Sequence, residues 1–495
     1  MRINTFFKKI KSQLCFRKTK DIIYLSLLKQ AIKNKTSRDF ILKKLDQKIY
    51  QALMEDQRHL PAIQLRKYQW LKGLITQFFK NLDKGYISPS FFGRVFELLG
   101  RRIFFRREVP EIKEARENFK KKYGIYPPLF IVVSPTQKCN LACKGCYAAS
   151  SPKTWPTLPF DVFDRILKEN HDIFGSRFVV ISGGEPLLYE SQGKNLLDIF
   201  EKYSDTFFIF YTNATLITKE VAKRLAELAN AIPQISVEGF KEETDARRGQ
   251  GVFERILEAI ENLKKEGVPF VISVTATREN LPLLLEEKFY QFWFDEKGAS
   301  YMWIFQLMPI GRGKEVFDLM PTPEERVKLY QRWEEMLKKG YPIADFWNSG
   351  VLSSGCIAYG REGSGYLYID WNGYIMPCVF IPYYVDTIYN LYQQGKTLAD
   401  ALFSDFFIKG REWQLDYGYR CPREAKNWLM PCSIRDHYKY FREIILPEEA
   451  KGEDEAASLA KDSIEYFQKL VAYDQELEKL TQPIWEKEYK KTKEN

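Results

Sequence analysis

The sequence predicts an α/β fold in which a parallel sheet is covered by helices. Two observations lead to this prediction: short apolar segments recur from about residue 125 onward, and a segment with helical periodicity lies between most neighbouring pairs. The strand candidates are 129–134, 177–182, 206–211, 233–237, 270–276 and 301–308. The helices are expected near 160–170, 194–203, 218–230, 251–266 and 281–296. Strands joined by helices pair in parallel through right-handed crossovers, so we expect one sheet, either open or curved into a partial barrel.

Length and composition are those of a globular protein with room for more than one domain. The 495 residues are 45% hydrophobic and 15% aromatic, which argues against a disordered chain. No run of about 18 uncharged apolar residues is present, so no transmembrane helix is expected, and the N-terminus lacks the features of a signal peptide. Eight cysteines, mostly grouped as thiol ligands, favour the reducing cytoplasm.

Residues 1–122 are expected to form a basic, all-helical module. They carry 30 Lys and Arg against 11 Asp and Glu, in a chain whose net charge is +10. Ser88 or Ser90 is expected to cap a helix from Phe91 to Arg107. Its apolar face consists of Phe92, Val95, Phe96, Leu99 and Ile103. This face either packs against the rest of the protein or lies on an anionic membrane surface. Nucleic acid is a weaker alternative because no recognition motif accompanies the charge.

Three thiols follow the first predicted strand within eight residues. Cys139, Cys143 and Cys146 lie on the loop after segment 129–134, in the sequence Cys-Asn-Leu-Ala-Cys-Lys-Gly-Cys. In open and barrel α/β sheets, ligands collect at this end of the strands. Three such thiolates can bind three irons of a 4Fe–4S cube and leave the fourth iron open, whereas structural zinc normally needs four protein ligands. The spacing favours iron–sulfur, with zinc as the open alternative.

A second motif ends the second predicted strand, in Phe178-Val-Val-Ile-Ser-Gly-Gly-Glu-Pro. Gly183 and Gly184 allow the backbone to approach a ligand closely, Glu185 offers a carboxylate, and Pro186 stiffens the turn. Together with Cys-x-x-x-Cys-x-x-Cys, this motif resembles the signature of the radical S-adenosylmethionine (radical SAM) enzymes. The resemblance implies a partial (β/α)6 barrel over 125–313, a 4Fe–4S cluster on the three thiols, and SAM bound through its amino group at the Gly-Gly-Glu-Pro segment.

The sequence departs from the family pattern at one place. The family usually has an aromatic residue just before the third cysteine, whereas this sequence has Gly145 there and Tyr147 after it. This departure concerns the contact with the adenine of SAM and not the cluster.

The resemblance also implies SAM contacts at the ends of later strands. Asn213, in Tyr211-Thr-Asn-Ala-Thr, would lie near the ribose. Ser236 and one arginine would hold the SAM carboxylate, with Arg248 preferred over Arg255. Ordinary loop and helix-cap chemistry is the alternative explanation of these residues. No catalytic side chain is singled out, because the cofactor carries the chemistry.

A second set of cysteines lies in residues 345–440. A predicted hairpin with its turn at Asn372-Gly373 leads to Cys378. The stretch from Cys356 through this hairpin resembles the opening of the SPASM/twitch auxiliary-cluster domain of some radical SAM enzymes. The resemblance implies one auxiliary 4Fe–4S cluster on Cys356, Cys378, Cys421 and Cys432, with no open iron if all four bind. Buried structural cysteines or a four-cysteine zinc site are the alternatives. Residues 448–492 are expected to form a charged helical tail.

The resemblance implies an enzyme that reductively cleaves SAM and uses the 5′-deoxyadenosyl radical to abstract hydrogen from a substrate carbon. A flavodoxin- or ferredoxin-type electron donor is an implied partner. Peptide or protein modification is the first expectation, because auxiliary-cluster relatives often act on peptides. The alternatives are a membrane-associated enzyme acting on a lipid and a non-catalytic iron–sulfur or zinc scaffold. The expected location is the cytoplasm; in the lipid version, residues 1–122 contact the inner face of the membrane.

Overall fold

A ten-stranded sheet organises the protein. The computed structural model describes residues 35–100 and 109–490. The strands follow one another in the order β13-β11-β10-β1-β2-β5-β6-β7-β8-β9. From β1 onward the strands lie side by side in chain order and pair in parallel. They are β1 (Ile131–Val133), β2 (Phe178–Ile181), β5 (Phe207–Thr212), β6 (Ala231–Val237), β7 (Val271–Ala276), β8 (Met302–Gln306) and β9 (Ile343–Asp345).

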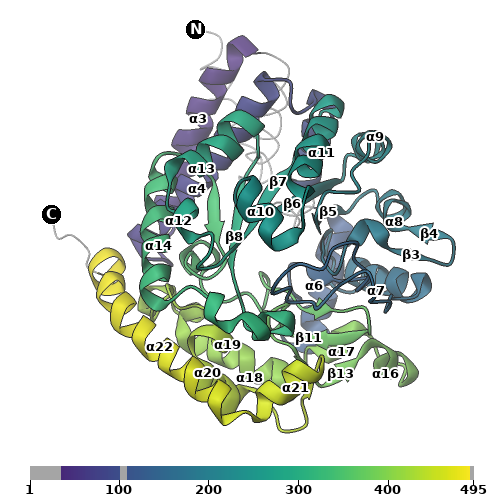
Figure 1. Ribbon diagram of the computed structural model, residues 1–495, viewed down its shortest axis with the longest axis vertical. Helices are drawn as coiled ribbons and strands as arrows, with labels where there is room; N and C mark the ends of the chain where they lie inside the picture. The colour runs from purple at the N-terminus through teal and green to yellow at the C-terminus, as the bar shows by residue number, and fades with distance from the viewer. Residues whose placement is uncertain (1–34, 101–108, 491–495) are drawn as a thin grey trace, which may run out of the picture.

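Helices cover the outer side of this sheet, and the predicted α/β architecture with a parallel sheet is confirmed (Figure 1). Each of the six predicted strands is present, and β9 adds a further parallel strand that is too short to stand out in the sequence. The helices between the strands are α7 (Phe160–Asp172), α8 (Leu196–Lys202), α9 (Lys219–Leu228), α10 (Lys241–Arg248), α11 (Val252–Glu266), α12 (Leu281–Leu284), α13 (Glu287–Gln291) and α14 (Pro323–Lys338). The helix predicted near 281–296 is broken into α12 and α13.

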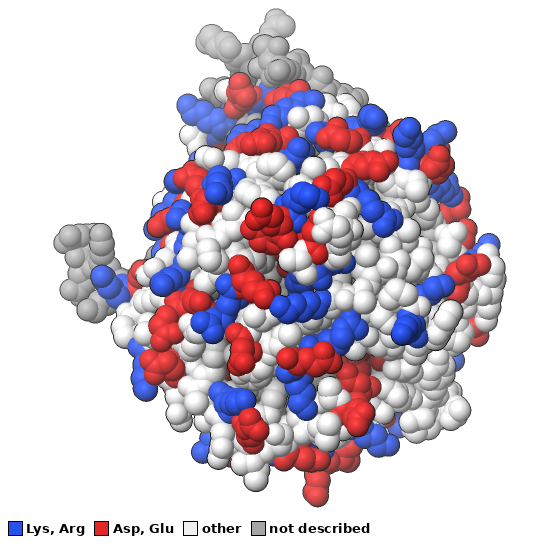
Figure 2. Space-filling model, viewed as in Figure 1, with Lys and Arg blue, Asp and Glu red and all other residues white. Residues whose placement is uncertain are grey.

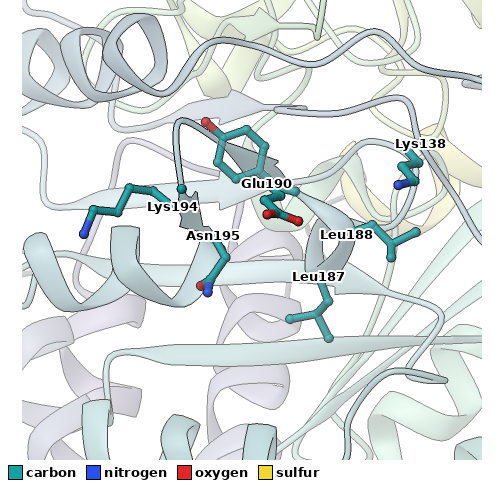
Figure 3. A pocket seen from close by; sticks show the side chains of 8 residues that line it. Lys138, Leu187, Leu188, Glu190, Lys194 and Asn195 are labelled. Carbon is teal, nitrogen blue, oxygen red and sulfur yellow. The ribbon is translucent and has the colours of Figure 1, made fainter.

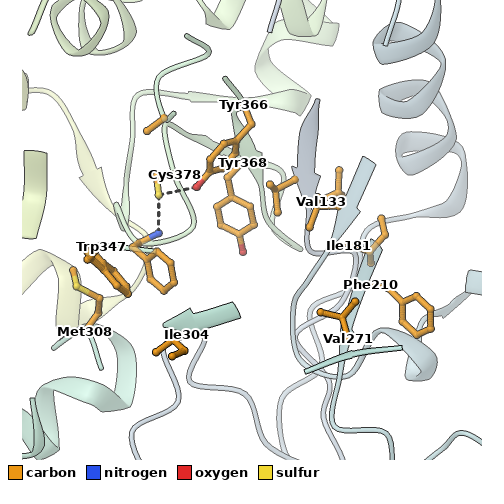
Figure 4. Packing of buried hydrophobic residues seen from close by; sticks show 14 of the residues in the cluster. Val133, Ile181, Phe210, Val271, Ile304, Met308, Trp347, Tyr366, Tyr368 and Cys378 are labelled. Atoms are coloured by element: carbon orange, nitrogen blue, oxygen red, sulfur yellow. Dashed lines mark hydrogen bonds between the residues drawn. The ribbon is translucent and has the colours of Figure 1, made fainter. Parts of the chain in front are cut away.

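The cysteine-bearing region after α14 shares this sheet. The predicted hairpin is β10 (Tyr368–Ile369) and β11 (Tyr374–Met376), and Gly373 in its turn has a φ of +73°. Strand β10 pairs in parallel with β1, and β13 (Asp386–Thr387) pairs with β11. Residues 345–440 therefore share one sheet and one hydrophobic core with the preceding strands. Figure 4 shows this shared core, where Val133 and Ile181 lie near Tyr368 of the hairpin.

The region after the hairpin is helical and packs back on the sheet. Helix α15 (Gly350–Ser353) precedes the hairpin, and the elements that follow it are β12 (Tyr383–Tyr384), α16 (Ile388–Gln393), α17 (Leu398–Ala401), α18 (Asp405–Gln414), α19 (Ser433–Asp436), α20 (Tyr438–Tyr440), β14 (Lys451–Gly452), α21 (Glu455–Asp462) and α22 (Ile464–Trp485). The predicted helical tail corresponds to α21 and α22, and α22 lies against α14, α19 and α20 (Figure 1).

The described part of residues 1–122 is helical, as predicted. Its helices are α3 (Lys35–Met54), α4 (Pro61–Asp83), α5 (Pro89–Glu97) and α6 (Pro110–Tyr123). Helix α4 is attached to the sheet-covering helices by buried polar contacts: Gln77 Nε2 donates to Phe294 O at 2.9 Å, and Asn81 Nδ2 donates to Gly298 O at 2.7 Å. Arg66 also forms a buried ion pair with Glu334 at 2.8 Å. These contacts join α4 to the helices that cover the sheet.

The apolar face of helix α5 packs against other parts of the protein. Ser88 Oγ accepts a hydrogen bond from Phe91 N at 3.2 Å, which confirms the predicted N-cap. Phe92 and Val95 are buried, while Phe96 and Leu99 are partly buried against hydrophobic clusters. The described part of this face thus packs inside the protein, and Ile103 lies outside the described residues. The face is covered because Leu45 of α3 and Phe79 of α4 form a hydrophobic cluster with Phe92.

Membrane contact through residues 1–122 stays a prediction. Residues 1–34 and 101–108, outside the described residues, hold 13 Lys and Arg against 2 Asp and Glu, more than half of the local positive excess. On the face in view, basic and acidic side chains are interspersed (Figure 2). Among the described residues, no helix combines the length and apolar character needed to cross a bilayer.

Candidate functional site

The loop that carries the first three thiols is attached to the Gly-Gly-Glu turn by backbone hydrogen bonds. Gly184 N donates to Thr136 O, and Glu185 N donates to Lys138 O, each at 2.9 Å. A Cβ on Gly183 would lie 2.6 Å from Thr136 O, and one on Gly184 would lie 2.3 Å from Lys138 O. The glycines were predicted to permit close approach to a ligand. In the structure they permit close approach to the backbone of the thiol loop.

Replacing Gly184 with alanine is expected to destabilise the protein by about 1–3 kcal/mol or more, because its Cβ would meet backbone oxygens that cannot move freely. The displaced loop should also bind less iron. Gly93→Ala is the matched control: nothing lies within 4 Å of its Cβ position in α5, so it should be neutral or stabilising by about 0.5–1 kcal/mol. Denaturant unfolding and iron content check both variants, and equal stabilities would contradict the prediction.

Cys139, Cys143 and Cys146 lie close enough together to influence one another's charge. Burial, with a smaller contribution from the neighbouring thiols Cys143 and Cys146, raises the pKa of the Cys139 thiol to about 12. Burial also raises the pKa of Cys143, while the nearby Arg248 lowers it. Burial therefore disfavours the thiolate forms of Cys139 and Cys143 unless a cation binds directly to sulfur. This behaviour fits a set of metal ligands.

Glu185 lies fully buried beneath the loop. Its Oε1 accepts a hydrogen bond from Thr212 Oγ1 at 2.8 Å, and its Oε2 accepts one from Asn213 N at 2.8 Å. Burial raises the pKa of this carboxyl to about 7, and the charge of Arg248 opposes the rise. Pro186 begins a 3₁₀ turn of residues Pro186–Leu188, whose Leu187 N also donates to Glu185 Oε1. The hydrogen bonds of this carboxyl thus connect the segment after β2 with the end of β5.

The other predicted SAM contacts gather at the same edge of the sheet. Asn213 Nδ2 donates to Asn140 Oδ1 at 2.8 Å and lies 3.8 Å from Cys139 Sγ. Arg248 pairs with the buried Glu238 at 2.5 Å, and its Nε has no hydrogen-bond partner. Ser236 lies half-buried on β6. The competing Arg255 is exposed and donates to Thr215 O. Of the two arginines, Arg248 is the one whose charge is found to act on a thiol: it lowers the pKa of Cys143.

Half-buried side chains on the central strands line an internal chamber. On β5 and β8, partly accessible residues alternate with buried ones, and β6 and β7 each have one partly accessible residue. Partial access in the middle of a covered sheet means that these side chains face a hollow. They are Ile209, Tyr211, Ser236, Thr275, Trp303 and Phe305. The chamber lies beside the thiol loop, since Tyr147 Oη and Ser182 Oγ form a hydrogen bond of 2.7 Å at this edge.

Aromatic rings form one wall of this chamber. The ring centroid of Phe305 lies 5.8 Å from Tyr211, 5.3 Å from Phe346 and 5.7 Å from Phe380. Phe380 in turn lies 5.8 Å from Tyr147, which directly follows Cys146. The wall therefore extends from the first set of thiols to the segment after Cys378. Such a surface suits contact with apolar or aromatic groups.

Three of the four later cysteines line one small cavity. Cys356, Cys378 and Cys432 border a space of about 70 Å³, and Cys421 is not among its lining residues. Tyr366 Oη lies 2.9 Å from Cys378 Sγ, and Phe380 N donates to the same sulfur at 3.4 Å (Figure 4). Burial raises the pKa of Cys378 to about 12 and raises those of Cys356 and Cys432 as well.

Buried arginines hold the backbone around this cavity. Arg326 forms a fully buried ion pair with Asp436 at 2.5 Å, and Asp436 Oδ2 accepts from Cys432 N at 3.0 Å. Arg361 donates to Cys356 O at 2.8 Å and to Ser354 O at 2.9 Å. No sequence motif singles out these residues, because their partners become neighbours only in the fold.

A separate hollow of about 360 Å³ lies on the outer side of the Gly-Gly-Glu turn. Figure 3 shows Lys138, which precedes Cys139, together with Leu187, Leu188 and Glu190 around it. The hairpin of β3 (Glu190–Ser191) and β4 (Lys194–Asn195) completes its lining. Sequence reasoning missed this hollow, since only the hairpin brings Lys194 and Asn195 beside the turn.

Neither thiol set has the arrangement of a single-ion site. Among residues 35–100 and 109–490, no three His, Cys, Asp or Glu side chains converge where one metal ion could bind them. Zinc requires such convergence. In an iron–sulfur cube each thiolate binds its own iron, so the sulfurs stay farther apart.

Comparison with known proteins identifies the chain's relatives. The model of the radical SAM superfamily matches residues 133–281. The mycofactocin maturase MftC of Mycolicibacterium smegmatis is 31% identical over 331 residues, which cover 63% of this chain and 76% of that protein. The AdoMet-dependent heme synthase of Methanosarcina barkeri is 29% identical over 287 residues, covering 52% of this chain and 78% of that protein. Among solved structures, Streptococcus suis SuiB bound to S-adenosylmethionine aligns with 60% of this chain and 71% of its own, with 20% identity and a TM-score of 0.47.

Sequence similarity to the maturase extends over most of that protein, and the superfamily match begins in β1 and includes the three thiols and the Gly-Gly-Glu turn. The chain therefore belongs to the radical SAM superfamily and is a radical SAM enzyme.

Proposed function

We propose that the enzyme cleaves SAM reductively at a 4Fe–4S cluster on Cys139, Cys143 and Cys146 and abstracts hydrogen from a carbon of a peptide or protein. The observation that supports this most is the attachment of the thiol loop to the Gly-Gly-Glu turn, with Arg248 beside both. One electron delivered at this site would break the C5′–S bond of SAM, giving methionine and a 5′-deoxyadenosyl radical that can attack an unactivated carbon.

The chain's own residues bind and orient the reactants. Glu185 would accept a hydrogen bond from the SAM amino group, since its Oε2 has one protein donor and a lone pair to spare. Arg248 would pair with the SAM carboxylate through its unpartnered Nε. Asn213 and Ser236 would contact the rest of the nucleoside. The aromatic chamber would hold the substrate carbon and exclude water.

A peptide or protein substrate is favoured by the relatives and by the site. The matched maturases are the more similar relatives, at 31% to 32% identity. The hollow beside the Gly-Gly-Glu turn presents Lys138, Glu190, Lys194 and Asn195, side chains that can bond to an extended chain. A flavodoxin- or ferredoxin-type protein remains the proposed electron donor.

Deuterium transfer tests the substrate class. The anaerobically reconstituted enzyme would be given SAM, dithionite and either the peptide or the lipid fraction of cells grown in deuterated medium. Deuterium in 5′-deoxyadenosine is expected with the peptide fraction, because the radical takes an atom from its substrate. Deuterium only with the lipid fraction would overturn the peptide assignment. Flotation with anionic vesicles, with and without residues 1–122, would then test membrane binding.

SAM binding is expected to strengthen by up to about tenfold from roughly pH 6 to pH 8. Because burial raises the pKa of Glu185 to about 7, the carboxyl is mostly neutral at the lower pH and mostly charged at the higher one. The charged form accepts the stronger hydrogen bond from the amino group. Equilibrium binding to the reconstituted enzyme measures this slope. Glu185→Gln should bind more weakly and lose the slope, and an unchanged slope in this variant would contradict the role of Glu185.

A further inference from the structure

We propose that Gln234 is the centre of a subsite on the floor of the internal chamber, and that this subsite binds a carboxamide group of the substrate. The side-chain amide of Gln234 would act as donor and acceptor at once, and the hydroxyls of Tyr211 and Tyr301 would complete the subsite. This inference rests on the proposed function, in which the chamber holds the substrate, and it adds the chemical group that the chamber recognises.

The register of the sheet places Gln234 on the chamber side of β6. In the parallel pairing, Gln234 lies opposite Tyr211 on β5 and opposite Val271 on β7. Neighbours in register point to the same face of a sheet, and so do residues two apart on one strand. Tyr211 and Ser236 are half-buried residues of the chamber, so Gln234 points to the chamber as well. Ser236 lies nearer the C-terminal end of β6, which leaves Gln234 on the floor.

The amide of Gln234 has no hydrogen-bond partner. The residue is fully buried, and both its Nε2 and its Oε1 are unbonded. Within residues 35–100 and 109–490 no other buried glutamine is in this state, since Nε2 donates to an oxygen in each of the others, Gln64, Gln77, Gln306 and Gln414. An amide left unbonded at both atoms inside a protein costs free energy. A ligand that pairs with both atoms would remove this cost.

Two tyrosine hydroxyls lie beside this amide. Tyr301 directly precedes β8, and its carbonyl accepts a hydrogen bond from Ile272 N at 3.2 Å. Its side chain shares a face with Trp303, two residues further on, which lines the chamber. Burial raises the pKa of Tyr211 well above its usual range, Tyr301 adds to this rise, and the Gln234 amide opposes it. The three side chains therefore lie close together, although the amide lacks the geometry of a hydrogen bond.

The chemistry of this floor favours a neutral ligand with a donor and an acceptor side by side. Tyr211, Gln234, Val271 and Tyr301 carry no charge at neutral pH, so a charged group would lose its hydration without gaining a counter-charge. A primary carboxamide presents its C=O and one N–H in the same direction and can form two hydrogen bonds with the Gln234 amide. A trans peptide group points its C=O and N–H in opposite directions, so it can form only one. The ligand group is therefore the side chain of an asparagine or glutamine of the substrate.

Small amides test the subsite directly. Acetamide, titrated into the anaerobically reconstituted full-length enzyme and followed by ligand-observed NMR, is expected to bind with a Kd on the order of 1–10 mM. Gln234→Leu removes both hydrogen bonds with little change in side-chain size, so it should weaken this binding roughly tenfold. N-methylacetamide represents a trans peptide group and acetate represents a carboxylate. Both should bind to the wild-type enzyme several times more weakly than acetamide does.

Gln77→Leu is the matched control. Gln77 is a buried glutamine of α4 whose Nε2 already donates to Phe294 O at 2.9 Å. This variant should lower the urea midpoint of unfolding, because the Phe294 carbonyl loses its donor, and it should leave acetamide binding unchanged. Gln234→Leu should raise the urea midpoint of the ligand-free enzyme, because it removes an unbonded amide. Deuterium transfer from the peptide fraction should fall roughly tenfold in Gln234→Leu and stay unchanged in Gln77→Leu.

Several results would overturn the inference. Acetamide binding that is absent, or equal in the wild type and Gln234→Leu, would remove the subsite. Tighter binding of N-methylacetamide or acetate would exclude a carboxamide ligand. A urea midpoint that falls in Gln234→Leu, as in Gln77→Leu, would mean that the amide is already satisfied in the folded protein. Unchanged deuterium transfer in Gln234→Leu would separate the subsite from the substrate. The binding and unfolding readouts need no SAM cleavage, so they are distinct from failure of the wild-type enzyme to form 5′-deoxyadenosine.

Discussion

Cys143→Ala is expected to lower 5′-deoxyadenosine formation by on the order of a thousandfold or more, to below detection. Two thiols are too few to hold the cluster that delivers the electron, and Cys143 lies between the other two in the loop. The measurement is chromatography of the products formed anaerobically from SAM and dithionite. Iron content should fall by about four per chain in the same variant.

Lys144→Ala is the matched control for this loss. Lys144 adjoins Cys143, and its side chain forms only an exposed ion pair with Glu279 at 2.7 Å. Such pairs contribute about 0–1 kcal/mol, and the backbone bond from Lys144 N to Arg247 O is retained. This variant should keep its iron and its activity. Cleavage of SAM at the wild-type rate by Cys143→Ala would refute the assignment of the first cluster.

Arg326→Met is expected to lower the free energy of unfolding by about 3–5 kcal/mol, because it leaves the charge of Asp436 buried without a partner. Arg326 also donates to Asn348 Oδ1 at 3.0 Å and to Leu429 O at 3.1 Å, so several buried acceptors lose a donor together. Since Asp436 binds Cys432 N, the variant should also lose iron from the second set of cysteines. Denaturant unfolding and iron analysis measure the two effects.

Arg58→Ala removes a comparable ion pair at the surface. Its guanidinium is largely exposed and lies 2.8 Å from Asp56, so the expected loss is within about 1 kcal/mol. Replacing both partners, in Arg326→Met/Asp436→Leu, should recover part of the stability that Arg326→Met loses, because no buried charge remains. A loss below about 1 kcal/mol in Arg326→Met would show that the buried pair does not hold this region together.

The features that sequence alone determined are local ones. The strands are apolar because most of their residues are buried, and the helices show a periodic apolar side, so both could be located without a structure. Cys139, Cys143 and Cys146 lie within eight residues in one loop, and Gly183 to Pro186 form one turn. Residues so close in sequence keep their spatial relation in almost any fold, which is why they carried the prediction of a radical SAM site.

Features that join distant parts of the chain were decided only by the tertiary structure. Arg326 meets Asp436 across 110 positions, and β10 extends the sheet by pairing with β1. The separation of Cys421 from the other three thiols also depends on how helices and turns pack. Periodicity and spacing describe each segment by itself, whereas burial, pairing and charge at a site depend on which segments the fold brings together.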